Sequence, residues 1–241
     1  MLLPALVWAV TALIWVGHGA ESHQTAAAPA RRDDNADFDW GSIRCPAANS
    51  QETFPTPSYR TEKGLFLVCT ELVINATPQE VYHALLDFQT YPAWNSFVRN
   101  VALPAEVVKT PDDVYVGLEM RFTTAGIIPL LNTTSDEIVT VMKGSFDDGG
   151  SPGEGEAEPA TTEGRYLMAA WRYDDGLHGT ASKSEHPNIL VNRGDGTTLY
   201  ISYETFFVGP GTLLLLPLKD TLQKQYTQQG LDLKAYVEKA A

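Results

Sequence analysis

His186 and Glu204 are the residues whose types and spacing best suit proton transfer. Between them the sequence NRGDGT, residues 192–197, separates two strand-like segments and supplies glycines for a tight hairpin turn. A turn centred there pairs residues whose numbers add to about 390, as those of His186 and Glu204 do. If both side chains face the interior, the carboxylate orients the imidazole and raises its pKa, which makes the pair a general acid or base. The alternatives are a polar pair on the solvent face and a one-residue register slip that separates the two side chains.

Neither a metal site nor a cofactor site is predicted. The histidines beyond the N-terminal segment form no H-x-x-x-H array, and no glycine-rich phosphate loop follows a strand. The segment GGSPG, residues 149–153, formally matches the G-x-S-x-G nucleophile motif, but its flanks are acidic and lack the buried strand and the helix that the motif requires. Ser151 is therefore not expected to be a nucleophile.

The composition is typical of one globular domain that avoids polyanions. The 241 residues are 44% apolar and 20% charged, which suits a single domain with a sizeable core. The formal net charge of -13 repels phosphate backbones and anionic lipid headgroups, and no Lys/Arg cluster offsets it locally. Nucleic acid is therefore not an expected partner, and the oligomeric state is left open.

The first residues are typical of a secretory signal peptide. An uncharged apolar run from Leu2 to Val16 is too short to span a bilayer comfortably, and small residues follow it. This pattern predicts a signal peptide over residues 1–20 and a protein that is secreted or stays in the lumen of the secretory pathway, without stable membrane insertion after cleavage. Because no Lys or Arg lies near Met1, an uncleaved signal anchor is the alternative.

Two cysteines and two glycosylation sequons are consistent with passage through the secretory pathway. Cys45 and Cys69 are expected to form a disulfide that pins an N-terminal extension to the first strand, and the alternative is two unpaired, buried thiols. Asn75 in NAT and Asn132 in NTT are predicted glycosylation sites, although such triplets are common by chance.

The predicted elements form an irregular extension and one α+β domain. Residues 21–55 lack periodicity and predict the extension, whereas residues 56–241 predict the domain. A strand rich in β-branched residues starts at Leu65. The helix after it begins with a capping box, in which Thr77 is the N-cap and Glu80 the third helical residue, and it runs to about Phe88 before a second short helical turn over residues 89–94.

Six further strands and an acidic loop are expected next. The predicted strands are residues 96–101, 114–124, 135–143, 165–174, 184–192 and 197–208. In the second of them Met120 and Phe122 lie on an apolar face that alternates with a polar one, which favours an antiparallel sheet with one apolar side. Residues 146–164 hold six acidic residues and no Lys or Arg, which predicts a solvated loop.

A long amphipathic helix is predicted at the C-terminal end. Apolar and aromatic residues, among them Leu222, Tyr226 and Leu233, recur at helical spacing from near Pro217 onward. Gly230 interrupts this pattern at a cost of about 1 kcal/mol relative to alanine, and it predicts a bend.

Three segments of the chain resemble a known superfamily. They are INATPQEVYHALLDFQTYPAWNSFV at residues 74–98, GDGTTLYISYETFFVG at residues 194–209 and GLDLKAYVEK at residues 230–239. Together they are similar to the START-like or SRPBCC superfamily, which includes plant pollen allergens, lipid-transfer domains and polyketide cyclases. The resemblance covers about residues 59–239 and implies the helix-grip fold, in which a curved antiparallel sheet wraps around a long C-terminal helix. Two short helices follow the first strand of that fold.

The resemblance also implies a cavity between the sheet and the long helix. Its expected ligand-binding residues are Tyr91, Trp94, Phe97, Met120, Phe122, Trp171, Leu222 and Tyr226. For the aromatic residues after the first helix, the alternative is that they only plug the gap between helix and sheet.

Three functions are compatible with these patterns. The first is binding of a hydrophobic small molecule, such as a polyketide-like secondary metabolite, and its cyclisation or dehydration without a cofactor, with His186 and Glu204 as the catalytic pair. The second is a non-catalytic carrier of a lipid or another hydrophobic ligand. The third is an extracellular interaction protein without a functional pocket. Convergent titratable groups in the cavity favour an enzyme, whereas a wholly apolar lining favours a carrier.

Overall fold

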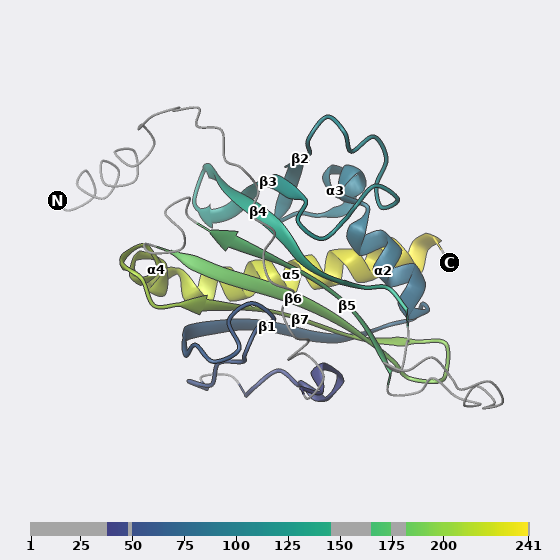
Figure 1. The fold of residues 1–241 in the computed structure, drawn as a ribbon, viewed down its shortest axis with the longest axis horizontal. Coiled ribbons are helices and arrows are strands. Elements are labelled where there is room, and N and C mark those ends of the chain that lie inside the picture. Colours follow the sequence, from purple (N-terminus) through teal and green to yellow (C-terminus); the bar gives the residue numbers. More distant parts are fainter. Residues whose placement is uncertain (1–37, 48–49, 146–164, 175–181, 241) are drawn as a thin grey trace, which may run out of the picture. The chain divides into compact units, whose positions relative to one another are not determined.

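The computed structural model describes residues 38–47, 50–145, 165–174 and 182–240 (Figure 1). The predicted signal peptide over residues 1–20 and the predicted acidic loop over residues 146–164 lie outside these residues. Within the described ranges, no helix is both long and apolar enough to cross a membrane.

Seven antiparallel strands of the described chain form one sheet in the order β1-β7-β6-β5-β4-β3-β2. The strands are β1 Gly64–Ile74, β2 Val98–Ala102, β3 Glu119–Ile128, β4 Leu131–Lys143, β5 Tyr166–Asp174, β6 Lys183–Asn192 and β7 Thr198–Phe207. Each strand from β2 to β6 pairs with the next one along the chain, and β1 pairs with β7, so β1 and β2 are the two edges. The predicted antiparallel α+β sheet is confirmed.

The predicted strand over residues 114–124 is wrong in its first half. β3 begins only at Glu119, because the residues before it form turns and Gly117 adopts a φ of +97° that favours glycine. The turn still closes against β4, since Gly117 N–H donates to Val139 O and Val139 N–H donates to Leu118 O.

One short 3-10 helix lies before β1, and the other helices of the described chain lie between β1 and β2 and at the C-terminal end. They are η1 Trp40–Ser42, α2 Pro78–Leu86, η2 Phe88–Thr90, α3 Tyr91–Trp94, α4 Pro210–Leu215, η3 Leu216–Leu218 and α5 Lys219–Ala240. The capping box of α2 is confirmed, because Thr77 accepts from the Glu80 N–H and the Glu80 carboxylate accepts from the Thr77 N–H. α5 begins at Lys219, close to the predicted start near Pro217, and it continues through Gly230 as one helix; the predicted bend there stays a prediction.

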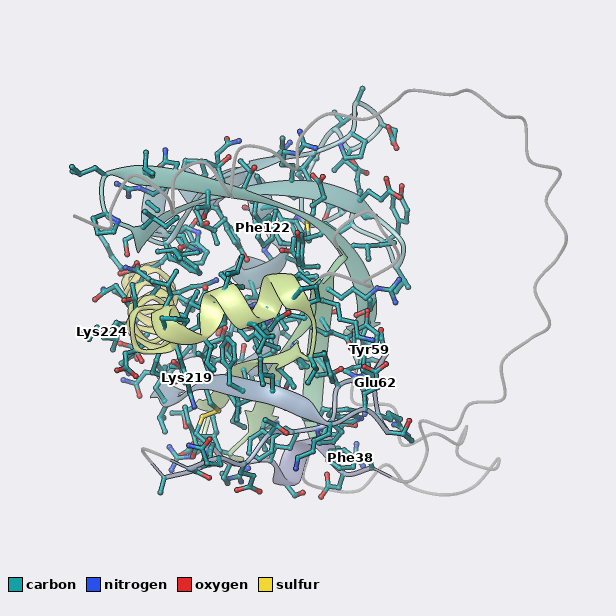
Figure 2. The ribbon with its side chains drawn as sticks, turned by 90° about the vertical axis from the view of Figure 1, so that its left-hand side faces the viewer. Phe38, Tyr59, Glu62, Phe122, Lys219 and Lys224 are labelled. Atoms are coloured by element: carbon teal, nitrogen blue, oxygen red, sulfur yellow. A yellow bond between two sulfur atoms is a disulfide. The ribbon has the colours of Figure 1, made fainter. Side chains whose placement is uncertain are left out.

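α5 lies on the concave side of the sheet and is fastened on both flanks (Figures 1 and 2). On the β1 flank, Gln223 accepts from the Cys69 N–H at 3.0 Å and donates to the Cys69 O at 2.7 Å. On the opposite flank, Gln225 donates to Gly126 O, and Asp232 accepts from the Ser96 N–H at 2.8 Å. At the β1 edge, a helix side chain thus satisfies backbone groups that lack a strand partner.

The N-terminal residues of the described chain cover the convex face. Trp40, Ile43 and Phe54 form a second apolar cluster with outward-facing residues of the sheet. Cys45 and Cys69 form a disulfide, which confirms the predicted pairing and fastens this segment to β1. As a result, both faces of β6 and β7 are largely buried.

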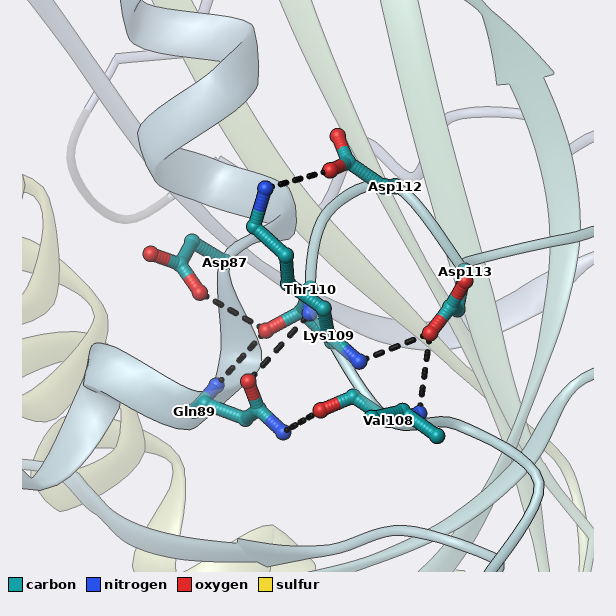
Figure 3. A network of polar contacts seen from close by, with 7 residues as sticks. All are labelled: Asp87, Gln89, Val108, Lys109, Thr110, Asp112 and Asp113. Carbon is teal, nitrogen blue, oxygen red and sulfur yellow. Dashed lines mark hydrogen bonds and ion pairs between the residues drawn. The ribbon is translucent and has the colours of Figure 1, made fainter.

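A polar network fastens the loop between β2 and β3 to the end of α2 (Figure 3). Thr110 donates to Asp87 Oδ1 at 2.7 Å and accepts from the Gln89 N–H at 3.1 Å. Gln89 in turn donates to Val108 O at 3.0 Å, and Asp113 accepts from the Val108 N–H at 2.9 Å. The loop is therefore fixed beside α2 by side chains from both segments.

Candidate functional site

The register of the sheet gathers polar side chains on its concave face. β6 pairs with β7 so that Glu185 lies opposite Thr205 and Asn188 lies opposite Ser202. The residue numbers of these pairs place His186 opposite Glu204, as the NRGDGT turn predicted. The predicted register is therefore confirmed.

Glu204 is a half-buried carboxylic acid held by two hydroxyl groups. Ser184 in β6 donates to its Oε1, and Tyr226 in α5 donates to its Oε2. Burial raises the pKa of Glu204 from 4.5 to about 7, and the bond from Ser184 opposes this rise. An acid with this pKa can both accept and release a proton near neutral pH.

His186 is more deeply buried than its neighbour Glu204. Its side chain is 5% exposed, and its Nε2 lies 2.7 Å from the hydroxyl of Ser202. The imidazole centroid lies 5.0 Å from that of Trp171 and 4.9 Å from that of Tyr226. Burial lowers the pKa of His186 to about 3, so the ring is neutral at physiological pH. The expectation that Glu204 orients His186 and raises its pKa is wrong, because Glu204 accepts from Ser184 and Tyr226 instead.

Hydrogen bonds link His186 and its neighbours on the concave face. Tyr200 donates its hydroxyl to Asn188 Oδ1 at 2.6 Å. The Nε2 of His186 and the hydroxyl of Ser202 share a hydrogen bond whose direction depends on the tautomer of the neutral imidazole. In the tautomer with its proton on Nε2, the other nitrogen, Nδ1, carries a lone pair.

Glu137 in β4 is a second carboxyl on the concave face, and it was not predicted as a site residue. It lies opposite Tyr173 in β5, which lies opposite Ser184 in β6, so it shares a row with the serine that binds Glu204. Desolvation and the charge of Glu204 raise the pKa of Glu137 well above 4.5. In the sequence, Glu137 alternates in phase with the buried Val139, and this was the signal for an inward direction. We name the group formed by Glu137, Ser184, His186, Ser202, Glu204 and Tyr226 the Glu204 cluster.

Several predicted apolar ligand-binding residues surround this cluster. Four of them are buried: Met120, Phe122, Trp171 and Leu222. Trp171 lies 5.9 Å from Phe122 between ring centroids, and Met120 lies opposite Glu137 in the register of β3 with β4. Figure 2 shows Phe122 between the sheet and the C-terminal helices. These side chains give the Glu204 cluster an apolar and aromatic wall.

Of the three predicted aromatic residues after α2, Tyr91 and Trp94 belong to α3 and Phe97 follows it. Tyr91 is fully buried and donates its hydroxyl to a backbone carbonyl of α2 at 2.6 Å. Trp94 stacks on Tyr236 of α5 with ring centroids 5.6 Å apart. Phe97 lies 5.8 Å from the ring of Tyr226. Of the three, Phe97 therefore contacts the Glu204 cluster, while Tyr91 and Trp94 pack the junction between the short helices and α5.

The Glu204 cluster is reached from the concave side of the sheet. Glu137 and Glu204 both face inward, yet each is only half-buried, so solvent reaches the space beside them. A different cleft of about 240 Å³ lies beside α2 and shares no residue with the cluster; Gln79, Tyr82, His83, Leu86, Pro111, Asp112, Met142 and Gly144 line it. Its volume is below the roughly 300 Å³ at which small-molecule pockets usually start.

The described residues also locate the remaining predicted positions. Asn75 and Asn132 are exposed, as a glycosylation site requires, and their modification stays a prediction. Among the described residues, no group of three or more His, Cys, Asp or Glu side chains could hold a metal ion.

Known proteins resemble this chain in fold rather than in sequence. No protein-family model matches it, and no curated protein matches it. A hypothetical protein from Helicobacter pylori is 12% identical with a TM-score of 0.54, over 79% of this chain and 99% of that chain. A protein from Thermus thermophilus is 16% identical with a TM-score of 0.49, over 73% of this chain and 99% of that chain. An aromatase/cyclase from a Streptomyces species is 10% identical with a TM-score of 0.49, over 72% of this chain and 93% of that chain.

Identities this low concern the fold alone, so the chemistry must be derived from the residues of this chain. The fold itself follows from a curved seven-stranded antiparallel sheet with a long C-terminal helix on its concave side and short helices after β1. The chain therefore has a helix-grip fold, as the resemblance of its sequence predicted.

Proposed function

We propose that the protein binds a hydrophobic small molecule beside the Glu204 cluster and promotes its cyclisation or dehydration. The observation that carries this proposal is the environment of Glu204, an acid with a pKa of about 7 next to buried aromatic side chains. The helix-grip fold supports it, because the curved sheet and α5 face each other across the cluster.

Glu204 is assigned the role of general base and general acid. Its carboxylate takes a proton from the carbon next to a carbonyl group of the bound molecule. The protonated acid then gives that proton to a hydroxyl group of the same molecule, which leaves as water while a carbon–carbon double bond forms. Ser184 and Tyr226 hold the two carboxyl oxygens in place during both steps. His186 is assigned a positioning role, since a neutral imidazole with a pKa of about 3 is a weak base.

A model reaction tests the proton transfer. β-Tetralone is an apolar ketone with acidic protons next to its carbonyl group, and their exchange in heavy water is followed by NMR. We expect the purified protein to accelerate this exchange and Glu204→Gln to abolish the acceleration. Glu119→Gln is the matched control, because Glu119 is an exposed acid on the outer face of β3, and it should leave the rate unchanged. No acceleration by the wild-type protein, despite bound β-tetralone, would contradict the catalytic part of the proposal.

A non-catalytic carrier is the alternative function. It predicts that β-tetralone binds without faster exchange and that native mass spectrometry of the purified protein finds a lipid or another apolar molecule, unaltered by incubation. An enzymatic function predicts instead that the molecule found carries a hydroxyl and a carbonyl group and is converted over time.

A further inference from the structure

The hydrogen-bonding groups of the Glu204 cluster are unbalanced toward acceptors. Of its three hydroxyl groups, those of Ser184 and Tyr226 are already used on Glu204, and that of Ser202 bonds to His186 Nε2. Each oxygen of Glu204 keeps a further lone pair, and the Glu137 carboxylate accepts from Ser135 with capacity to spare. A ligand at this place therefore meets free acceptors on two carboxylates.

His186 adds a third acceptor. In the tautomer with its proton on Nε2, the Nδ1 atom carries a lone pair, and no hydrogen-bond partner of Nδ1 is found among the described residues. The side chain is only 5% exposed and its ring lies between Trp171 and Tyr226. Nδ1 is not one of the fully buried polar atoms that lack a partner, so a ligand or a water molecule can reach it.

Positive charge does not balance the two carboxyls. The described groups that shift the pKa of Glu137 are Glu204, Ser135 and Asp136, and none of them is a Lys or Arg. Among the described groups, only the hydroxyl of Ser184 shifts the pKa of Glu204, in addition to burial. On α5, Lys224 is exposed and lies on the outer side of the helix (Figure 2). The aromatic rings of Trp171 and Tyr226, in contrast, suit a cation, because ring faces attract positive charge.

We propose that the Glu204 cluster selects ligands in which a primary ammonium group is attached to an apolar body. An ammonium group has three N–H donors and a positive charge, and the cluster offers the carboxylates of Glu137 and Glu204 and the Nδ1 of His186. The apolar body lies against the wall formed by Phe122 and Trp171. This inference rests on the proposed function, because it names the class of ligand for the same concave space.

Three probes of equal size test it. Naphthylmethylamine, naphthylmethanol and naphthoate share one apolar body and differ in charge, and their binding is measured by calorimetry at about pH 8, where Glu204 is mostly ionised. We expect the amine to bind at least about tenfold more tightly than the alcohol, and the acid to bind more weakly than the alcohol. Glu137→Gln and Glu204→Gln should each reduce the preference for the amine while keeping the affinity for the alcohol, which also shows that the variants are folded. Glu119→Gln should change none of the three affinities.

The pH dependence gives a second readout. The titratable groups that face the site are Glu137, Tyr173, His186, Glu204 and Tyr226. An ammonium group binds the ionised carboxyls, so binding at pH 7 should release protons, and the measured heat should depend on the ionisation enthalpy of the buffer. Equal affinities for amine and alcohol would overturn the inference and leave the proposed function standing. If none of the three probes binds, the hydrophobic-ligand part of the proposed function is contradicted as well.

Discussion

The hydroxyl of Tyr226 donates a hydrogen bond to Glu204, and this bond joins α5 to β7 across the concave face. The other carboxyl oxygen of Glu204 accepts from Ser184 within the sheet. The acid is therefore positioned jointly by the sheet and by the helix that closes it. Both donors favour the ionised form of Glu204. A shift in the position of α5 is therefore expected to change the pKa of Glu204.

Tyr226→Phe should raise the pKa of Glu204 above about 7. The variant removes a donor to the carboxylate and keeps the ring that contacts His186 and Phe97. We also expect a loss of about 1 kcal/mol in the free energy of unfolding. The carboxyl titration is measured by infrared spectroscopy, with Tyr236→Phe as the control, since that ring stacks on Trp94 instead. An unchanged or lowered pKa in Tyr226→Phe would contradict the role of this bond.

Glu204 should make the protein less stable as the pH rises. Its pKa is 4.5 in the unfolded chain and about 7 in the folded one, so the folded state binds the proton more tightly. This contribution is fully present below about pH 4.5 and is lost as the pH rises through 7. Glu137 acts in the same direction, because its pKa is raised as well.

Glu204→Gln removes the charge and keeps a side chain of the same size. At about pH 8 we expect this variant to be more stable than the wild type by on the order of 1–3 kcal/mol, and at about pH 5 the advantage should shrink. Urea unfolding across this pH range measures the difference. If the stability of the two proteins changed in parallel with pH, the pKa of Glu204 would not be raised in the folded state.

His186 should remain neutral across the physiological pH range. Its folded pKa of about 3 lies below the ordinary 6.5, so the stability that it contributes is present above about pH 6.5 and is lost as the pH falls toward 3. In NMR spectra, the imidazole carbon signal assigned by His186→Gln should not move between about pH 5 and pH 8. The same signal should move in the urea-unfolded protein. A midpoint near 6.5 in the folded state would restore His186 as a candidate general base.

Local patterns predicted much of the fold and half of the site. The capping box at Thr77 and the turn at NRGDGT depend on neighbouring residues, so the start of α2 and the position of His186 opposite Glu204 followed from the sequence. The partner of Glu204 did not follow from it. Tyr226 approaches Glu204 only because the sheet curves around α5, and such a contact between distant segments leaves no periodic signal.

Glu137 and the covered convex face of the sheet also depend on contacts between distant segments, which the sequence did not predict. Glu137 is an acidic residue in a predicted strand, and its surroundings depend on the register of β4 with β5, which was not predicted from the sequence. Trp40, Ile43 and Phe54 cover the convex face without any helical or strand period, so the segment that contains them gave no sign of packing against the sheet. Sequence patterns predict elements, whereas the site depends on how distant elements meet.

Gly230→Ala should destabilise the protein although alanine favours helices. A Cβ atom at this position would lie 2.8 Å from Thr70 Cγ2 and 3.0 Å from Leu72 Cδ2, because α5 touches β1 there. The gain of up to about 1 kcal/mol in helix propensity is expected to be outweighed by overpacking, with a net loss of about 1–2 kcal/mol in the free energy of unfolding. Urea unfolding measures it, and Lys224→Ala on the exposed side of α5 is the control. Because α5 also carries Tyr226, pushing the helix away from β1 should weaken its bond to Glu204 and slow β-tetralone exchange. A Gly230→Ala variant as stable and as active as the wild type would show that α5 has room to shift without disturbing the Glu204 cluster.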